Sequence, residues 1–295
     1  MRVGFIGTGT MGGPIAANLL AAGNQLNVFD IDRSTTIPLE EAGALVCGEL
    51  ADLARESEIV MMSLPGPTEV KFVAQELLES MFAGQILVDM STNSPALLKE
   101  IALLGESKGV SVLDAPVSGG VYGARKGTLT LMIGGNKTKF EKLKPVWDCI
   151  GSNIFYLGEV GSGNVAKLVN NMLAFSIMMT NAEALVLGAK MGIDLNVLWN
   201  VVKTSSGGSV TWEGGGRAIL KDRLPPMFTV DLACKDIGLA TELADQVGVD
   251  LSMVSRAEEL LRKFQNEGFA QEDILATIKA LEKSVDVNVR GVWKE

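Results

Sequence analysis

The sequence of 295 residues has no histidine, only three cysteines and 5% aromatic residues. Histidine is the usual proton donor and acceptor near neutral pH, so any acid–base chemistry here must use another side chain. The cysteines are Cys47, Cys149 and Cys234, which lie far apart and form no Cys-x-x-Cys pair. We therefore expect neither a disulfide framework nor a metal site, and a reducing compartment.

Positive charge and long apolar runs are scarce as well. The 26 basic residues are outnumbered by 35 acidic ones, and no basic block is longer than a pair or triplet. Nucleic-acid binding, which needs a basic surface that follows phosphates, is therefore not expected. No window of 18 residues is uninterruptedly apolar, and no long apolar segment precedes the first glycines. We accordingly predict a cytoplasmic protein with no membrane partner.

The first half of the chain alternates short apolar runs with amphipathic stretches. Strands are predicted at 2–7, 25–30, 58–65, 85–91, 111–117, 128–135 and 153–158, and helical patterns occur between them at 11–23, 67–80 and 94–109. This alternation indicates βαβ units. The predicted fold class is α/β, with a Rossmann-type, doubly wound and mostly parallel sheet.

After about residue 161 the strand-like runs stop. Helical patterns cover 163–191, 194–206, 230–248, 251–268 and 271–285. We therefore divide the chain into a dinucleotide-binding Rossmann domain, 1–161, and an all-α C-terminal domain, 162–295. The second domain begins with a long interdomain helix, and we expect it to serve substrate binding and oligomerisation.

The motif "GTGTMG" follows the first predicted strand and opens the first predicted helix. Its first glycine permits a tight turn, its second lets the backbone approach a pyrophosphate, and its third allows close packing of helix and strand. The candidate cofactor-binding residues of this motif are Gly7, Thr8, Gly9, Thr10, Met11 and Gly12.

An acidic residue follows at the expected distance. Asp30 ends the second predicted strand, 18 positions (30 − 12) after the last glycine of the motif. A carboxylate there accepts the ribose hydroxyls of an adenosine and repels the 2′-phosphate of NADP, so NAD is the predicted cofactor. Arg33 keeps NADP as an alternative. Further contacts are expected at the ends of later strands, from Ser63, Leu64, Pro65 and Thr92.

Five motifs occur in an order typical of one known family. They are the glycine motif, "DAPVSGG" at 114–120, "GARKGTLTLMIGG" at 123–135, "GSGNVAKLVNN" at 161–171 and "LACKDIGLA" at 232–240. By these motifs the sequence resembles, over essentially its whole length, the β-hydroxyacid dehydrogenase family, which includes 3-hydroxyisobutyrate dehydrogenases and semialdehyde reductases. The resemblance implies an NAD(P)-dependent interconversion of a short 3-hydroxy acid and its aldehyde or ketone.

The resemblance also implies roles for individual residues. Lys167 resembles the catalytic lysine of the family, and Asn171 resembles the amide one turn later. Lys235 resembles the lysine near the nicotinamide, while Asp236 is expected to be a structural partner. The candidate substrate-binding residues are Ser118, Gly119, Gly120, Asn170 and Lys235, of which the first three resemble the loop that holds the substrate carboxylate.

Residue chemistry points to the same lysine. Lys167 and Asn171 are four positions apart and so share one face of a helix. The ammonium can give the carbonyl oxygen a proton as hydride arrives, and the amide can hold that oxygen. A lysine pKa of about 10.4 is too high for an efficient base near neutrality, so we expect desolvation or a second cation, for which Lys235 is the candidate, to lower it.

Several alternatives stay open. One is a glyoxylate or succinic semialdehyde reductase that uses NADPH, and another, of a different class, is a non-catalytic NAD-binding interaction module. A 6-phosphogluconate dehydrogenase is disfavoured because Asn170 stands where that family usually has histidine. One of Arg125 and Lys126 is a candidate for binding a second anionic group of the substrate. The long apolar helix predicted at 163–191 favours a homodimer or homotetramer.

Overall fold

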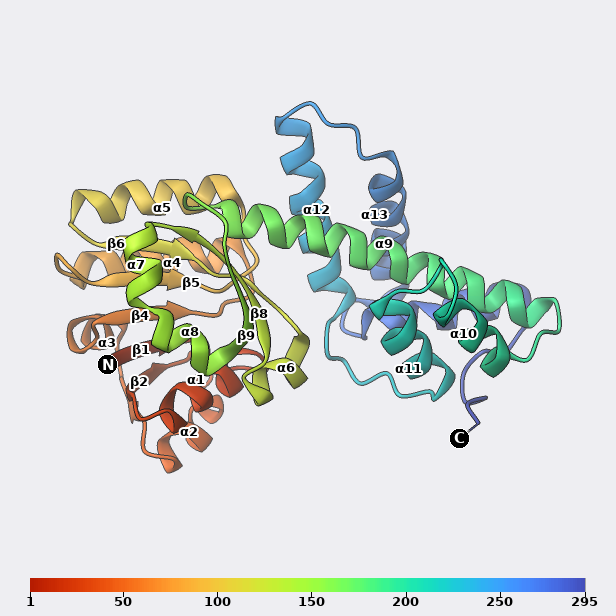
Figure 1. Ribbon diagram of the computed structural model, residues 1–295, viewed down its shortest axis with the longest axis horizontal. Helices are drawn as coiled ribbons and strands as arrows, with labels where there is room; N and C mark the ends of the chain where they lie inside the picture. Colours follow the sequence, from red (N-terminus) through yellow and green to blue (C-terminus); the bar gives the residue numbers. More distant parts are fainter. Residues whose placement is uncertain (295) are drawn as a thin grey trace. The chain divides into compact units, whose positions relative to one another are not determined.

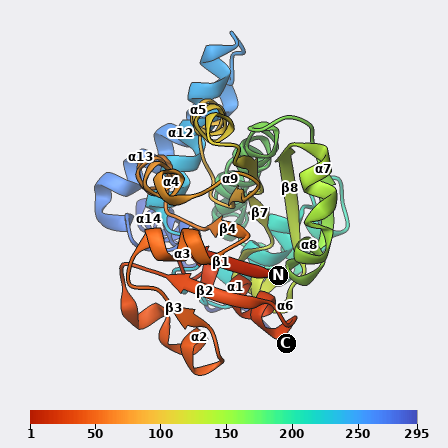
Figure 2. The ribbon, with the colours of Figure 1, turned by 90° about the vertical axis from the view of Figure 1, so that its left-hand side faces the viewer.

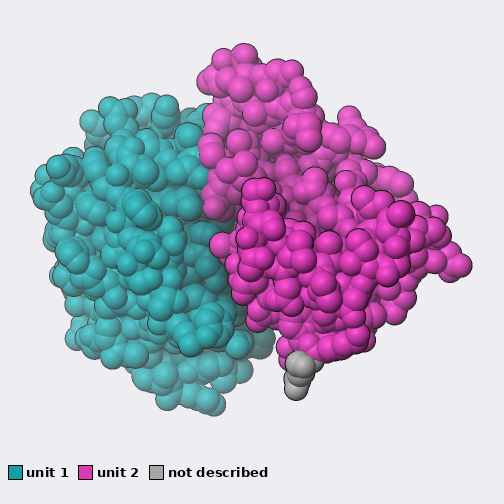
Figure 3. Space-filling view, turned by 45° about the vertical axis from the view of Figure 1, so that its right-hand side comes forward, with its two compact units in different colours: residues 1–167 teal, residues 168–295 magenta. Residues whose placement is uncertain are grey.

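The computed structural model describes residues 1–294, which form two compact units (Figure 3). Unit 1 comprises Met1–Lys167, and unit 2 comprises Leu168–Glu295. Figure 1 shows the strands gathered in unit 1, whereas unit 2 is built from helices. The α/β fold class followed by an all-α part is therefore confirmed.

Unit 1 contains one twisted sheet. Its strands are β1 (Arg2–Ile6), β2 (Gln25–Phe29), β3 (Leu45–Val46), β4 (Ile59–Met62), β5 (Ile86–Asp89), β6 (Ser111–Asp114), β7 (Val117–Ser118), β8 (Leu129–Gly135) and β9 (Gly151–Tyr156). The order is β3-β2-β1-β4-β5-β6-β8-β7, and β9 pairs with β8. Strands β1 to β6 are parallel to one another, whereas β8 runs antiparallel to its neighbours β6 and β7.

Helices cover both faces of this sheet (Figure 2). They are α1 (Gly12–Ala21), α2 (Ile37–Glu41), α3 (Leu50–Glu56), α4 (Pro67–Ser80), α5 (Pro95–Ser107), α6 (Gly120–Lys126), α7 (Lys137–Lys142) and α8 (Lys144–Ile150). In β4, Ile59 and Met61 join the core formed with α1, α6 and α8, whereas Val60 and Met62 join the core formed with α3, α4 and α5. This alternation explains why the strand is apolar throughout: both of its faces are buried.

The segment predicted as one strand at 111–117 is divided in the structure. The chain leaves the parallel sheet after Asp114, passes through Ala115 and Pro116, and returns as β7, which pairs with the antiparallel β8. Proline cannot donate a ladder hydrogen bond, which accounts for the interruption. Strand β3 and helices α2, α3, α6, α7 and α8 were not predicted, because elements this short show little periodicity.

The long helix α9 (Ser162–Lys190) begins in unit 1 and continues into unit 2. The other helices of unit 2 are α10 (Leu195–Lys203), α11 (Arg217–Leu220), α12 (Val230–Gln246), α13 (Ser252–Phe264) and α14 (Ile278–Val285). Phe175 and Met179 of α9 pack with α12 and α13, and further along the helix Ala182 and Leu185 pack with α10 and α11. Both hydrophobic cores of unit 2 are thus built on one helix.

Helix α9 is long and apolar enough to span a bilayer, judged by length and composition alone, and 39% of its most apolar window is buried. The central helix of a soluble core has the same composition, and α9 supplies buried residues to both cores of unit 2. We therefore interpret its apolarity as the result of packing.

Candidate active site

The three motif glycines differ in what surrounds them. Gly7 has φ +84°, and a Cβ there would lie 2.2 Å from the carbonyl oxygen of Ser63. A Cβ on Gly12 would lie 1.8 Å from the carbonyl oxygen of Gly7. A Cβ on Gly9, by contrast, would meet nothing within 4 Å. The fold requires the first and third glycines, whereas the open space at Gly9 suits a ligand that approaches the backbone closely.

Asp30 directly follows β2 and braces the glycine loop. Its Oδ2 accepts a hydrogen bond from the Thr8 amide at 2.7 Å, and its Oδ1 accepts one from the Asp32 amide at 2.9 Å. The Thr8 hydroxyl lies 2.7 Å from that of Thr35, a contact that no sequence signal indicated. A carboxylate has about four lone-pair sites, so Asp30 can still accept hydrogen bonds from a ribose. Arg33, in the turn that follows, is exposed.

The ends of the other parallel strands lie at the same edge of the sheet. The Ser63 amide bonds to the carbonyl oxygen of Ile6 at 2.9 Å, and the Leu64 amide bonds to the hydroxyl of Ser91 at 2.9 Å. Thr92 is the next residue after that serine and is half-buried. The structure thus brings the predicted cofactor contacts after β1, β2, β4 and β5 to one edge, and this arrangement fits a dinucleotide.

The remaining predicted contacts in this region differ in exposure. Thr10 and Pro65 are exposed, whereas Met11 packs against the core beside α1.

The predicted carboxylate-binding loop joins β7 to α6. Ser118 ends β7, Gly119 has φ +127° and Gly120 has φ +61°. A Cβ on Gly120 would meet nothing within 4 Å, and both glycines are exposed. The first amides of a helix lack intrahelical partners, so an exposed loop at this point can bind a carboxylate.

The two basic residues of α6 lie in its last turn. Arg125 and Lys126 are both exposed. The Lys126 ammonium lies 4.5 Å from the ring centroid of Tyr122, one turn earlier on the same helix. The suggestion that one of these residues binds a second anionic group stays a prediction.

Lys167 is half-buried in the second turn of α9 and is the last residue of unit 1. It therefore belongs to the same unit as the glycine loop and as Ser118, Gly119 and Gly120. The other residues predicted to act with it, Asn170, Asn171 and Lys235, belong to unit 2.

The predicted polar residues of unit 2 form one connected group around Asp236, which is 2% exposed. The side-chain amide of Asn171 donates to Oδ2 of Asp236 at 2.7 Å, and its Oδ1 accepts a hydrogen bond from Asn170 at 3.0 Å. Nζ of Lys235 lies 2.7 Å from Oδ1 of Asp236, close enough for an ion pair although the approach is off the hydrogen-bond axis. The carboxylate thus holds both the amide and the ammonium.

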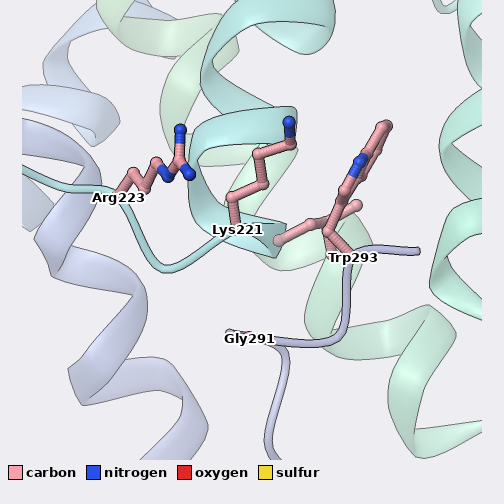
Figure 4. Close-up of a pocket in the computed structure, with 5 residues that line it drawn as sticks. Lys221, Arg223, Gly291 and Trp293 are labelled. Carbon is pink, nitrogen blue, oxygen red and sulfur yellow. The ribbon is translucent and has the colours of Figure 1, made fainter. Parts of the chain in front are cut away.

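The described residues contain no group of three His, Cys, Asp or Glu side chains that could hold a metal ion. Two surface cavities contain none of the predicted site residues. The one in unit 2, of about 180 Å³, is lined by Leu220, Lys221, Arg223, Gly291 and Trp293. Figure 4 shows the side chains of Lys221 and Arg223 extending in the same direction, with Lys221 between Arg223 and the indole of Trp293.

Comparison with known proteins agrees with these features. Residues 2–158 match the family model described as the NAD binding domain of 6-phosphogluconate dehydrogenase. Residues 161–281 match the model described as NAD-binding of NADP-dependent 3-hydroxyisobutyrate dehydrogenase. The chain is 37% identical over 295 residues to the 2-(hydroxymethyl)glutarate dehydrogenase of Eubacterium barkeri, which covers 99% of this chain and 98% of the relative. The chain belongs to the β-hydroxyacid dehydrogenase family.

Other members of the β-hydroxyacid dehydrogenase family are similarly close. The 3-hydroxyisobutyrate dehydrogenase of Pseudomonas aeruginosa is 39% identical over 268 residues, with 88% of this chain and 90% of the relative covered. The solved structure of Mycobacterium tuberculosis 3-hydroxyisobutyrate dehydrogenase with L-serine has a TM-score of 0.87 at 30% identity, covering 95% of this chain and 99% of that one. As a β-hydroxyacid dehydrogenase, the protein is an oxidoreductase that uses NAD, with NADP as the alternative.

The contrast among the glycines gives a first prediction. Gly9→Ala should leave the free energy of unfolding within roughly 0.5 kcal/mol of wild type, because the added methyl group meets no protein atom. It should weaken NADH binding by about tenfold or more, since the methyl group occupies space that the backbone leaves open to the ligand. Urea unfolding and fluorescence titration with NADH measure the two effects.

Gly48→Ala is the matched control, because a Cβ there also meets nothing within 4 Å and the residue is exposed in the same unit. Gly48→Ala should change neither the free energy of unfolding nor the affinity for NADH. Unaltered NADH affinity in Gly9→Ala would show that the cofactor does not approach this loop.

Proposed function

We propose that this protein oxidises 3-hydroxy acids that carry a hydroxymethyl group on the carbon next to a carboxylate, R–CH(CH₂OH)–COO⁻, to the corresponding semialdehydes, with NAD as oxidant. The observation that carries the proposal is the chemistry shared by the compounds named for the relatives. The relatives are named for 2-(hydroxymethyl)glutarate and 3-hydroxyisobutyrate, and L-serine accompanies the solved structure. All three compounds have this group, and they differ only in R, which is carboxyethyl, methyl or amino.

The residues of unit 1 suit the shared part of these substrates. We assign the carboxylate to the loop at Ser118, Gly119 and Gly120, whose exposed backbone can bind an anion. Lys167, as the neutral amine, takes the hydroxyl proton while the carbon–oxygen bond becomes a carbonyl, and it returns a proton in the reverse direction. The nicotinamide, when bound, accepts the hydride from the same carbon or supplies it.

The unit 2 group supports this step. Asn171 gives one N–H to Asp236 and accepts a hydrogen bond from Asn170, so its second N–H is the one that can bind the substrate oxygen. The suggestion that Lys235 serves as a second cation stays a prediction from the sequence. The carboxylate of Asp236 contacts Lys235, and we propose that it orients both side chains without reacting itself.

A substrate panel tests the proposed activity. We expect turnover of 3-hydroxyisobutyrate, L-serine or 2-(hydroxymethyl)glutarate with kcat/KM at least about tenfold above that of 4-hydroxybutyrate and glycolate, the reduced forms of succinic semialdehyde and glyoxylate. NAD should be preferred over NADP because of Asp30. Preference for succinic semialdehyde or glyoxylate, each reduced with NADPH in the reverse direction, would favour the semialdehyde reductase alternative. No turnover with any compound would favour the non-catalytic module.

Replacing the lysine tests the mechanism. Lys167→Ala should lower kcat by about 10²–10⁴-fold, the usual contribution of a general acid or base, while NADH binding stays unchanged. Lys142→Ala removes an exposed lysine of α7 in the same unit and should retain full activity. Near-normal turnover of Lys167→Ala would exclude this lysine from proton transfer.

We also propose a homodimer or homotetramer. Several apolar side chains of α9 are exposed in the single chain, among them Val169 (44%), Leu173 (54%) and Leu187 (65%). Exposed apolar side chains along one helix could be covered by a second copy of the chain. Light scattering should give a multiple of 31.3 kDa, and a particle of 31.3 kDa at working concentration would contradict the proposal. A cytoplasmic location without nucleic-acid or membrane partners remains our expectation from composition.

A further inference from the structure

Two buried aspartates stand at the carboxyl ends of neighbouring strands. Asp89 ends β5, Asp114 ends β6, and the two are paired in register. Both are 0% exposed. Burial raises the pKa of Asp89 to about 6 and also raises the pKa of Asp114. Removing two carboxyl groups from water is costly unless hydrogen bonds compensate each of them, so their partners indicate their role.

Asp114 holds the first turn of α9 with both of its oxygens. Oδ1 accepts a hydrogen bond from the amide of Gly161 at 2.7 Å, and Oδ2 accepts one from the amide of Asn164 at 2.7 Å. The Asn164 side chain adds a longer bond to Oδ2 at 3.3 Å. The N-terminal end of a helix favours a carboxylate, which strengthens this attachment.

The space around this carboxylate is made by glycines. A Cβ on Gly134 of β8 would lie 2.4 Å from Oδ1 of Asp114, and a Cβ on Gly163 of α9 would lie 2.9 Å from Oδ2. Any larger residue at these positions would press on the carboxylate. The close approach of β8 and α9 to Asp114 therefore depends on the absence of side chains.

A chain of hydrogen bonds connects this turn to a loop on the cofactor side. Oδ1 of Asn164 accepts from the amide of Asn93 at 2.7 Å, and the Asn93 side chain donates to Oδ2 of Asp89 at 3.2 Å. Oδ1 of Asp89 accepts from the amide of Ser91 at 3.0 Å, whose hydroxyl accepts from the amide of Leu64 at 2.9 Å. All of these residues belong to unit 1.

We propose that Asp89, Asn93, Asp114 and Asn164 are positioning residues that fix Lys167 relative to the loops after β4 and β5. Lys167 follows Asn164 by three residues on α9, so any displacement of the first turn moves the lysine as well. The residues act through the lysine and not on the substrate. The inference rests on the proposed catalytic role of Lys167.

Asn164→Ala tests the inference, because it removes the side-chain bonds and leaves the backbone bond to Asp114 in place. We expect kcat to fall by about 10²-fold, the usual cost of a small misplacement in an active site, while the Kd for NADH changes less than twofold. Gln85→Ala is the matched control. Gln85 is a buried amide at the start of β5, the opposite edge of the sheet, and its side chain makes three hydrogen bonds. It should lower stability by a similar amount and leave kcat unchanged.

The double variant Lys167→Ala/Asn164→Ala separates positioning from other roles. If Asn164 acts through the lysine, the double variant should be no slower than Lys167→Ala alone. The inference would be overturned if the double variant lost kcat by the product of the two single losses. It would also be overturned if Asn164→Ala and Gln85→Ala lowered kcat equally. Normal kcat in Asn164→Ala when Lys167→Ala is inactive would overturn it as well. An active Lys167→Ala would instead contradict the proposed function itself.

If Asn164→Ala fails to fold, Asp114→Asn is the alternative, because it preserves the side-chain volume. It should likewise lower kcat and leave the Kd for NADH unchanged, since an amide cannot accept all three hydrogen bonds that Asp114 accepts from Gly161 and Asn164.

Discussion

Parallel pairing of β1, β2, β4, β5 and β6 places the carboxyl ends of five strands at one edge, and the unit 1 part of the site depends on this constraint. The glycine loop, Asp30, Ser63 and Thr92 follow four of these strands, and Asp114 ends the fifth. At a strand end, the last carbonyl group can accept a hydrogen bond from the loop that follows the neighbouring strand. The bond from the Ser63 amide to the end of β1 is an example.

In the proposed function a lysine carries the acid–base chemistry, because the chain has no histidine, and the ordinary pKa of a lysine, about 10.4, is unfavourable for this role. An amine can act as a base near neutral pH only if neighbouring groups lower its pKa. The helices that carry the amine and these groups must therefore be held rigidly. The structure attaches the start of α9 through Asp114 and holds the Asn171 amide through Asp236. Each attachment uses a carboxylate that is almost completely buried. Rigid attachment of this kind is easier to build into strand ends and helices than into mobile loops.

Much of this arrangement could be predicted from local sequence. The helix expected at 67–80 has the same bounds in the structure, because Pro67 starts it and a clear apolar period follows. The roles of Gly7, Gly9 and Gly12 followed from spacing and match the space around each one. The prediction of one strand at 111–117 was wrong at its end. After Asp114 the chain no longer pairs with β5, and it continues as β7, which pairs with β8; no local pattern records such a long-range change.

The sequence by itself determined the fold class and the nucleotide motif, because these depend on periodicity and spacing within short segments, whereas Lys167 is the candidate for proton transfer chiefly because its motif resembles that of the family. Only the tertiary structure decided which residues form hydrogen bonds with one another. Asn171 and Asp236 are 65 positions apart, and Asn164 and Asp114 are 50 apart. Hydrogen bonds between such residues form only after strands and helices have packed. The motifs of the sequence mark Asp236 as a structural partner, but only the fold shows which groups each carboxylate binds.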